Sequence, residues 1–241
     1  MFSRHALPIA LSALAILTGC RGAATEAAVP TASGNGLTVV ELFESQGCSS
    51  CPPAIRNVNA IAARKDLLAL TFSVTYWDYL GWKDSFGQPA FTARQRDYAA
   101  SRGGWGVYTP QVVVNGKTAL VGSNPAELAA TISQAGQVAL LKTSQASGDA
   151  VDVAAQPGLR QPVDLWLVRY DPRSRPVPID RGENAGRTID HRNVVVGLIR
   201  LGRWDGKALH VPLAATPEKG LASALLAQQP NGGAIIAAAK I

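Results

Sequence analysis

The sequence lacks several features that mark common classes of protein. Charged residues make up only 17% of the 241 positions and apolar residues 47%, a composition that favours a globular fold over a disordered chain. We find no internal repeats and no low-complexity tracts. The formal net charge is +6, but arginine and lysine are scattered, without a run of four. Nucleic-acid-binding proteins usually gather such charge into a patch or stripe, so we expect no nucleic-acid partner.

Sulfur is also scarce. Met1 is the only methionine, and the three cysteines are Cys20, Cys48 and Cys51. In an exported protein, an odd number of cysteines leaves one of them without a disulfide partner. The N-terminal region indicates both that this protein is exported and which cysteine is the unpaired one.

The N-terminal segment has the pattern of a secretory signal. The basic Arg4 precedes an almost unbroken apolar run from Ala6 to Leu17, and small residues follow it. The run is shorter than the roughly 20 apolar residues that a membrane-spanning helix needs. We therefore expect residues 1–19 to be a signal peptide and the mature protein to be exported to the bacterial periplasm.

The end of this segment, Leu17-Thr18-Gly19-Cys20, resembles a lipobox, the bacterial motif whose cysteine is lipidated and becomes the first residue of the mature chain. A lipid on Cys20 would anchor the protein to a membrane and leave Cys48 and Cys51 as the only thiols. Residues 20–36 would then be a tether. The alternative is ordinary cleavage after a small residue, without a lipid.

Residues 37–141 alternate between strand and helix patterns. The order is a strand at 37–43, a helix from Cys51, a strand at 68–76, a helix at 89–102, strands at 112–114 and 118–121 around Asn115-Gly116-Lys117, and a helix that begins at Asn124-Pro125 and fades near 140. This order is similar to that of thioredoxin. We therefore expect an α/β, thioredoxin-like domain, with a central mixed sheet flanked by helices.

Residues 142–241 have a different character. Residues 163–168 and 194–199 are typical of strands, and the loop at 172–187 between them is rich in proline and arginine. A turn at 229–233 follows residues 222–229, which could be a strand or a helix. We expect a second, small and mostly β domain here.

Cys48 and Cys51 form a Cys-x-x-Cys motif between the first strand and the first helix. The N-terminus of a helix presents unpaired N–H groups and a partial positive charge, which stabilise a thiolate. Disulfide exchange uses an exposed attacking thiol and a shielded thiol that resolves the mixed disulfide. We therefore assign Cys48 as the nucleophile and Cys51 as the resolving cysteine. The expected partners are protein thiols and disulfides of the cell envelope, and we expect no cofactor.

Other functions of the motif stay open. The pair could be a structural disulfide in a non-catalytic binding module. It could also handle copper through two thiolates and one histidine. A zinc site is less favoured, because the sequence has no second cysteine pair and His191 and His210 lie far along the chain.

Two further residues fit the exchange hypothesis. Pro110, after Thr109, stands where thioredoxin-like proteins carry a cis-proline that faces the cysteines, although an ordinary trans proline is the alternative. Glu41 precedes Cys48 by seven positions on the first strand. It could be a buried carboxylate that relays the proton of Cys51, or an exposed strand residue.

An aromatic stretch follows the second strand. Its aromatic residues are Tyr76, Trp77, Tyr79 and Trp82. They could form a partner-binding rim beside the cysteines, because Trp and Tyr are enriched at interface hot spots. The alternative is that they pack the inserted segment onto the sheet. Likewise, Asn184, Arg187 and His191 could line a polar site between the two halves, or could anchor a loop.

Several motifs together resemble one known family. They are Glu41-Leu42-Phe43, Ser45 to Ala54, Tyr76 to Asp84, Phe91 to Gln95, Val107 to Gln111, Asn115-Gly116 and Arg181 to Arg187. On these motifs the chain resembles the exported bacterial proteins catalogued as domain of unknown function 1223. The resemblance implies a thioredoxin-like fold but no activity, because that family has no established reaction. Compared with thioredoxin itself, Ser49-Ser50 replaces Gly-Pro between the cysteines, and two prolines follow the motif.

Overall fold

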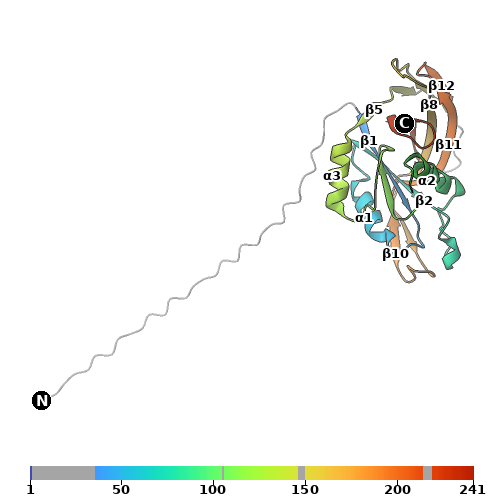
Figure 1. The fold of residues 1–241 in the computed structure, drawn as a ribbon. Coiled ribbons are helices and arrows are strands. Elements are labelled where there is room, and N and C mark those ends of the chain that lie inside the picture. Colours follow the sequence, from blue (N-terminus) through green and yellow to red (C-terminus); the bar gives the residue numbers. More distant parts are fainter. Residues whose placement is uncertain (2–35, 105, 146–149, 214–218) are drawn as a thin grey trace.

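The structure is a computed structural model that describes residues 1, 36–104, 106–145, 150–213 and 219–241 (Figure 1). The expected signal peptide, the lipidation site Cys20 and the tether therefore lie outside the described residues, apart from their two end positions. None of the helices in the described part of the chain is long and apolar enough to cross a membrane.

The chain forms a mixed α/β structure with one large sheet. Its strands are β1 (Gly36–Glu44), β2 (Leu67–Ser73), β3 (Gln111–Val114), β4 (Thr118–Leu120), β5 (Val138–Leu140), β8 (Val163–Asp171), β11 (Val194–Trp204), β13 (Ala222–Gln228) and β14 (Ile235–Lys240). The helices are α1 (Cys51–Ile61), α2 (Pro89–Ser101), α3 (Pro125–Ala135) and the short 3-10 helix η1 (Asp78–Leu80). Two smaller sheets are formed by β6 (Thr143–Gln145), β7 (Ala150–Val153) and β12 (Leu209–Pro212), and by β9 (Arg175–Pro178) and β10 (Thr188–His191).

The large sheet closes on itself. Its strand order is β2-β11-β8-β13-β14-β5-β1-β3-β4, and β1 also pairs in parallel with β2. Seven strands therefore form a ring, with the β3–β4 hairpin attached to β1. Strands from both sides of residue 141 share this ring, and the division of the chain into two domains at that point stays a prediction.

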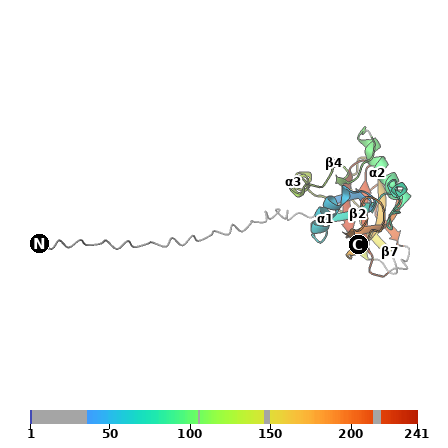
Figure 2. The same cartoon turned by 90° about the horizontal axis from the view of Figure 1, so that it is seen from below.

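Side chains fill three apolar clusters around the ring. The first draws residues from β1, β2, β8, β11, β13 and β14 and from α2, so it occupies the inside of the ring. The second lies outside β1, β2 and β3 under α1 and α3, and the third lies outside β8, β13 and β14 under the β6-β7-β12 sheet. Figures 1 and 2 show α1 and α3 on one side of β1 and β2, and α2 on the other.

Most expected elements are confirmed, with differences at their ends. The first helix begins at Cys51 as expected, and residues 222–228 are a strand rather than a helix. The second strand ends at Ser73, before the aromatic stretch. The third helix stops at Ala135, where Gly136 follows, and the expected last turn is strand β5 instead. The expected loop at 172–187 contains β9, which pairs with β10.

The β3–β4 hairpin joins the two halves of the chain at Asn115-Gly116. The Ile235 N–H donates to the Asn115 carbonyl at 3.0 Å, and the Asn115 side chain accepts the Val39 N–H at 2.8 Å. Gly116 has a positive φ of 66°, and a Cβ there would lie 2.7 Å from the Gly233 carbonyl oxygen. Both the backbone conformation and the close approach therefore require glycine.

We predict that Gly116→Ala destabilises the protein more than Gly103→Ala does. Both residues have a positive φ, which costs an alanine about 1–2 kcal/mol, but a Cβ on Gly103 would meet nothing within 4 Å. The urea midpoint of each variant measures the difference. Equal losses would contradict the close contact between the hairpin and the loop before β14.

Candidate functional site

The cysteine motif lies where β1 passes into α1. Cys48 and Cys51 form a disulfide with a Cα–Cα distance of 5.4 Å, and α1 begins at Cys51. Both cysteines are buried, with 1% and 0% of their surfaces exposed, whereas Ser49 and Ser50 are exposed. The only parts of the motif that face solvent are therefore the two serines between the cysteines.

Pro110 lies beside the motif, as its sequence position predicts. The Thr109–Pro110 peptide bond is cis. The Ser50 hydroxyl donates to the Thr109 carbonyl at 3.4 Å, and it lies 3.3 Å from the Cys48 sulfur. The Trp77 indole donates to the Thr109 hydroxyl at 2.7 Å.

The aromatic residues differ in their surroundings. Trp82 donates its indole N–H to Gln46 Oε1 at 2.9 Å, and Trp77 packs against the apolar clusters on both sides of the sheet. Tyr76 is half-buried, and this burial raises the pKa of its hydroxyl to about 12. Tyr79 is 77% exposed. Packing therefore accounts for Trp77 and Trp82. The partner-binding rim stays a prediction, and of the four aromatic residues Tyr79 is the exposed one.

A loop from the C-terminal half covers the motif. The Asn184 side-chain amide donates to the carbonyl oxygens of Gln46 at 2.9 Å and of Cys48 at 2.8 Å. The Glu183 carboxylate accepts the Ser49 N–H at 3.1 Å, and the Arg187 guanidinium donates to Asn184 Oδ1 at 3.0 Å. The sequence singled out Asn184 and Arg187 but not Glu183, which lies 134 positions from Ser49 with no pattern to connect them.

Glu41 is buried, but on the wrong side of the sheet for a relay. It points into the ring, where its carboxylate accepts from the Arg94 guanidinium at 2.7 Å and from the Tyr98 hydroxyl. The cysteines pack outside the ring with Val40 and Leu42, its two neighbours on β1. Because side chains alternate between the two faces of a strand, the hypothesis that Glu41 relays a proton to Cys51 is corrected. Glu41 is the counter-ion of a buried arginine.

The face of β1 that carries the cysteines has a carboxylate of its own, Glu44. Its Oε1 accepts from the Ser73 hydroxyl at 2.6 Å, and its Oε2 lies 3.6 Å from His191 Nε2. Asp84 is close by, and its carboxylate accepts the Gln46 N–H at 2.7 Å. Glu44, Asp84 and His191 are all buried. Among the described residues, Glu44 Oε2 and both His191 ring nitrogens have no hydrogen-bond partner.

Burial shifts the protonation of this cluster. Burial, and then the charge of Glu44, raise the pKa of Asp84 to about 7. Burial is the largest single effect and lowers the pKa of His191. The Glu44 carboxylate, the charge of Asp84 and the Arg175 backbone together raise it by more, so the pKa of His191 lies above its usual value. The cluster therefore holds a proton near neutral pH. Sequence reasoning missed Glu44 and Asp84, although the alternation along β1 places Glu44 on the face of Leu42.

Comparison with known proteins places the chain in a family. The profile of the DUF1223 proteins, described as proteins of unknown function, matches residues 39–228. The chain belongs to this family. No curated protein sequence matches it. Among the described residues, no group of three His, Cys, Asp or Glu side chains is placed to hold a metal ion.

Two solved structures are similar to this DUF1223 protein. A crystal structure of protein AGR_C_4864 from Agrobacterium tumefaciens is 29% identical, with a TM-score of 0.72, over 87% of this chain and 96% of that one. A structure of HBP35 of Porphyromonas gingivalis is 14% identical, with a TM-score of 0.59, over 87% of this chain and 76% of that one. At that identity, the second likeness concerns the fold alone.

We predict that Glu41→Gln destabilises this DUF1223 protein by about 3 kcal/mol or more, because it leaves the buried Arg94 charge without a counter-ion. Urea unfolding measures the loss. The matched control is Asp205→Asn, which removes a carboxylate from an ion pair on the surface with Lys207 and should leave the midpoint unchanged. Equal midpoints for the two variants would contradict the role given to Glu41.

We also predict that the protein loses stability as the pH rises from about 4 to 7. The folded state binds the Asp84 proton more tightly than the unfolded chain, whose pKa is near 3.8, and this advantage disappears as the pH passes through 7. The raised pKa of His191 acts in the same direction, but only as the pH rises above the unfolded value of about 6.5. One proton changes the free energy of unfolding by about 1.4 kcal/mol per pH unit.

Urea unfolding across this pH range tests the second prediction. Asp84→Asn should flatten the slope, and Asp97→Asn, which replaces an exposed carboxylate on α2, should keep it. A wild-type slope of zero, or the same slope in Asp84→Asn, would count against the buried cluster as its source.

Proposed function

We propose that this protein exchanges disulfides with protein partners in the cell envelope through Cys48 and Cys51. We further propose that its first half, residues 37–141, is thioredoxin-like and that a lipid on Cys20 anchors the exported chain to a membrane. The observation that carries the proposal is the meeting of three parts at one point: the disulfide, the start of α1, and the Thr109–Pro110 segment, whose Thr109 carbonyl accepts the Ser50 hydroxyl.

The helix explains the order of the two cysteines. Cys48 precedes the first turn of α1, where backbone N–H groups and the helix dipole stabilise a thiolate. A partner thiolate attacks the Cys48 sulfur, the Cys48–Cys51 bond breaks, and the electron pair stays on Cys51. A second thiol of the partner then releases the reduced pair and leaves with the new disulfide, so two electrons pass to this protein. The reverse steps oxidise a partner dithiol.

The buried cluster takes the place that Glu41 cannot take. Leu42 of β1 and Ile189 of β10 pack in the same apolar cluster as both cysteines. Glu44 lies two positions after Leu42 and His191 two positions after Ile189, so both lie on the same side of the sheet as the cysteines. A thiolate released at Cys51 in this buried environment needs a proton. We propose that Glu44, Asp84 and His191 supply it, because together they hold a proton near neutral pH.

One observation favours a second candidate function. Both sulfurs are buried, and Asn184 and Glu183 are bonded to the motif from outside. A closed, covered disulfide suits a staple in a binding module. Under the exchange proposal, the loop at 180–187 moves away before a partner reaches Cys48.

Thiol reactivity separates the two functions. After reduction, we expect Cys48 to alkylate at least tenfold faster than Cys51, with a pKa below the ordinary value of about 8.5. The measurement is the alkylation rate of each thiol against pH in Cys51→Ser and Cys48→Ser. We also expect Cys51→Ser to trap mixed disulfides with envelope proteins, whereas Cys48→Ser should not.

Equal and slow alkylation of both thiols, with a reduction potential below about −300 mV, would instead establish a structural disulfide. In that case the two serine variants should lose stability in equal measure, because each removes the same cross-link.

A further inference from the structure

A groove runs along the flank of α1 from the motif. It has a volume of about 1020 Å³, with α1 on one side and the segment 187–192, which includes β10, on the other. Pro52, next to Cys51, lies at one end, and Ala63 at the other. Asn59 ties the two walls together, since its side chain donates to the Asp190 carbonyl at 2.8 Å and accepts the Arg192 N–H at 3.1 Å. These hydrogen bonds fix the position of the segment 190–192 relative to α1, so the groove has a defined shape beside the disulfide.

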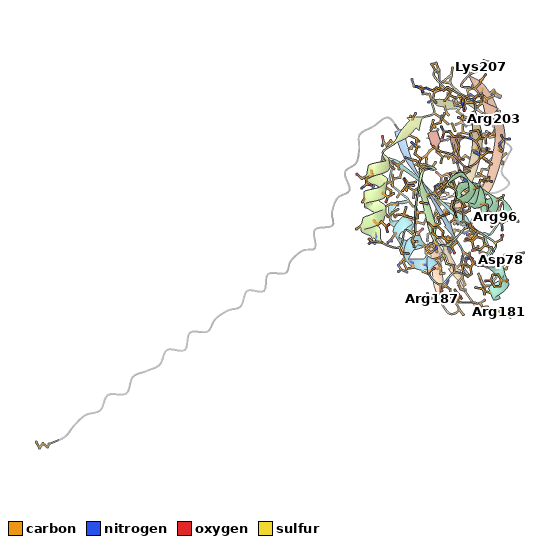
Figure 3. All side chains as sticks on the ribbon, in the orientation of Figure 1. Asp78, Arg96, Arg181, Arg187, Arg203 and Lys207 are labelled. Atoms are coloured by element: carbon orange, nitrogen blue, oxygen red, sulfur yellow. A yellow bond between two sulfur atoms is a disulfide. The ribbon has the colours of Figure 1, made fainter. Side chains whose placement is uncertain are left out.

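The floor of the groove is apolar and its rim is basic. Ile55 and Ile189 are buried along the floor. Arg56, Arg187 and Arg192 are exposed on the rim, and in the described part of the chain none of these three guanidinium groups forms an ion pair. The one carboxylate of the lining, that of Asp190, already accepts the Ser174 hydroxyl at 2.5 Å. Figure 3 labels Arg187 at the end of the molecule where Figure 1 places β10, and labels Arg96 near α2, away from that end.

The rim is connected to the motif through hydrogen bonds. Arg187 donates to the side-chain oxygen of Asn184, whose amide holds the Cys48 carbonyl. An anion bound at Arg187 therefore competes with Asn184 Oδ1 for the Arg187 guanidinium, which helps to hold Asn184 on the motif. The chain's own Glu183 already places a carboxylate on the Ser49 N–H, so the surface around the motif accepts an acidic side chain.

We propose that this groove binds an acidic segment of the partner protein, with carboxylates on the arginine rim and aliphatic side chains on the floor. This rests on the exchange function proposed above and names the class of segment that the partner presents next to its cysteine. The helical part of the wall, from Pro52 to Ala60, extends about 12 Å at 1.5 Å per residue. An extended segment of about four residues fills that length. Each carboxylate can form charge-assisted, bidentate bonds with a guanidinium group.

The test is binding of a cysteine-free, fluorescently labelled octapeptide of alternating Glu and Leu to the full-length protein, followed by fluorescence anisotropy. We expect it to bind at least tenfold more tightly than the same peptide with Gln for Glu. We expect Arg56→Gln/Arg192→Gln to abolish that preference and Arg56→Lys/Arg192→Lys to retain part of it. Arg96→Gln, on the exposed face of α2, should change nothing. High salt should weaken the preference, because it screens exposed charges.

Equal affinity for the Glu and Gln peptides, or an unchanged preference in Arg56→Gln/Arg192→Gln, would overturn the proposal. The unfolding midpoint of this double variant should match that of the wild type, because both side chains are exposed and form no ion pair within the described residues. If the double variant has a lower midpoint and also loses binding, the single variants Arg56→Gln and Arg192→Gln decide the question. An unchanged preference for the Glu peptide in both single variants would overturn the proposal.

Versions of both peptides that carry one cysteine separate this proposal from the exchange function. We expect the Glu version to form a mixed disulfide with Cys48 at least tenfold faster than the Gln version. Exchange at equal rates would overturn the role of the groove and leave the exchange function standing. Binding of the Glu peptide without any exchange would overturn the exchange function, while the acidic-segment site would stand.

Discussion

The site depends on the alternation of side chains along β1. Glu41 and Glu44 are three positions apart, so they lie on opposite faces of the strand. Glu41 points into the closed ring and neutralises Arg94, while Glu44 points outward, to the side where α1 packs. A shift of one position would exchange these two environments. It would place a carboxylate without an arginine inside the ring and an apolar side chain beside His191.

The same strand explains why the C-terminal half contributes to the motif. Because β1 lies in a ring that includes β8, β11, β13 and β14, the segments between those strands come back to the face that carries α1. One such segment brings Glu183 and Asn184 onto the motif, and β10 supplies His191 and one wall of the groove. The C-terminal half thus supplies the residues that cover the motif, the histidine of the buried cluster and one wall of the groove.

Local patterns were sufficient for most of the elements. Strand alternation, an Asn cap and an Asn-Gly turn are short-range signals, so the expected strands and helices of residues 37–141 were found within a few residues. The errors are at ends, where tertiary pairing overrode propensity, as at β5, which pairs with β1 and β14. The cis bond before Pro110 was also expected from position. Glu41 was misplaced because both faces of β1 are apolar, and alternation alone does not tell which face α1 covers.

The sequence by itself determined the cysteine motif at a helix start, the order of elements up to Leu141, and the family, because each depends on residues that are neighbours in the chain. Only the tertiary structure decided that the two halves close one ring, that Glu44 rather than Glu41 shares the face of the cysteines, and that Asn184 covers Cys48. The physical reason is distance along the chain. Asn184 is 136 positions from Cys48, and such contacts follow from the pairing of whole strands rather than from any local preference.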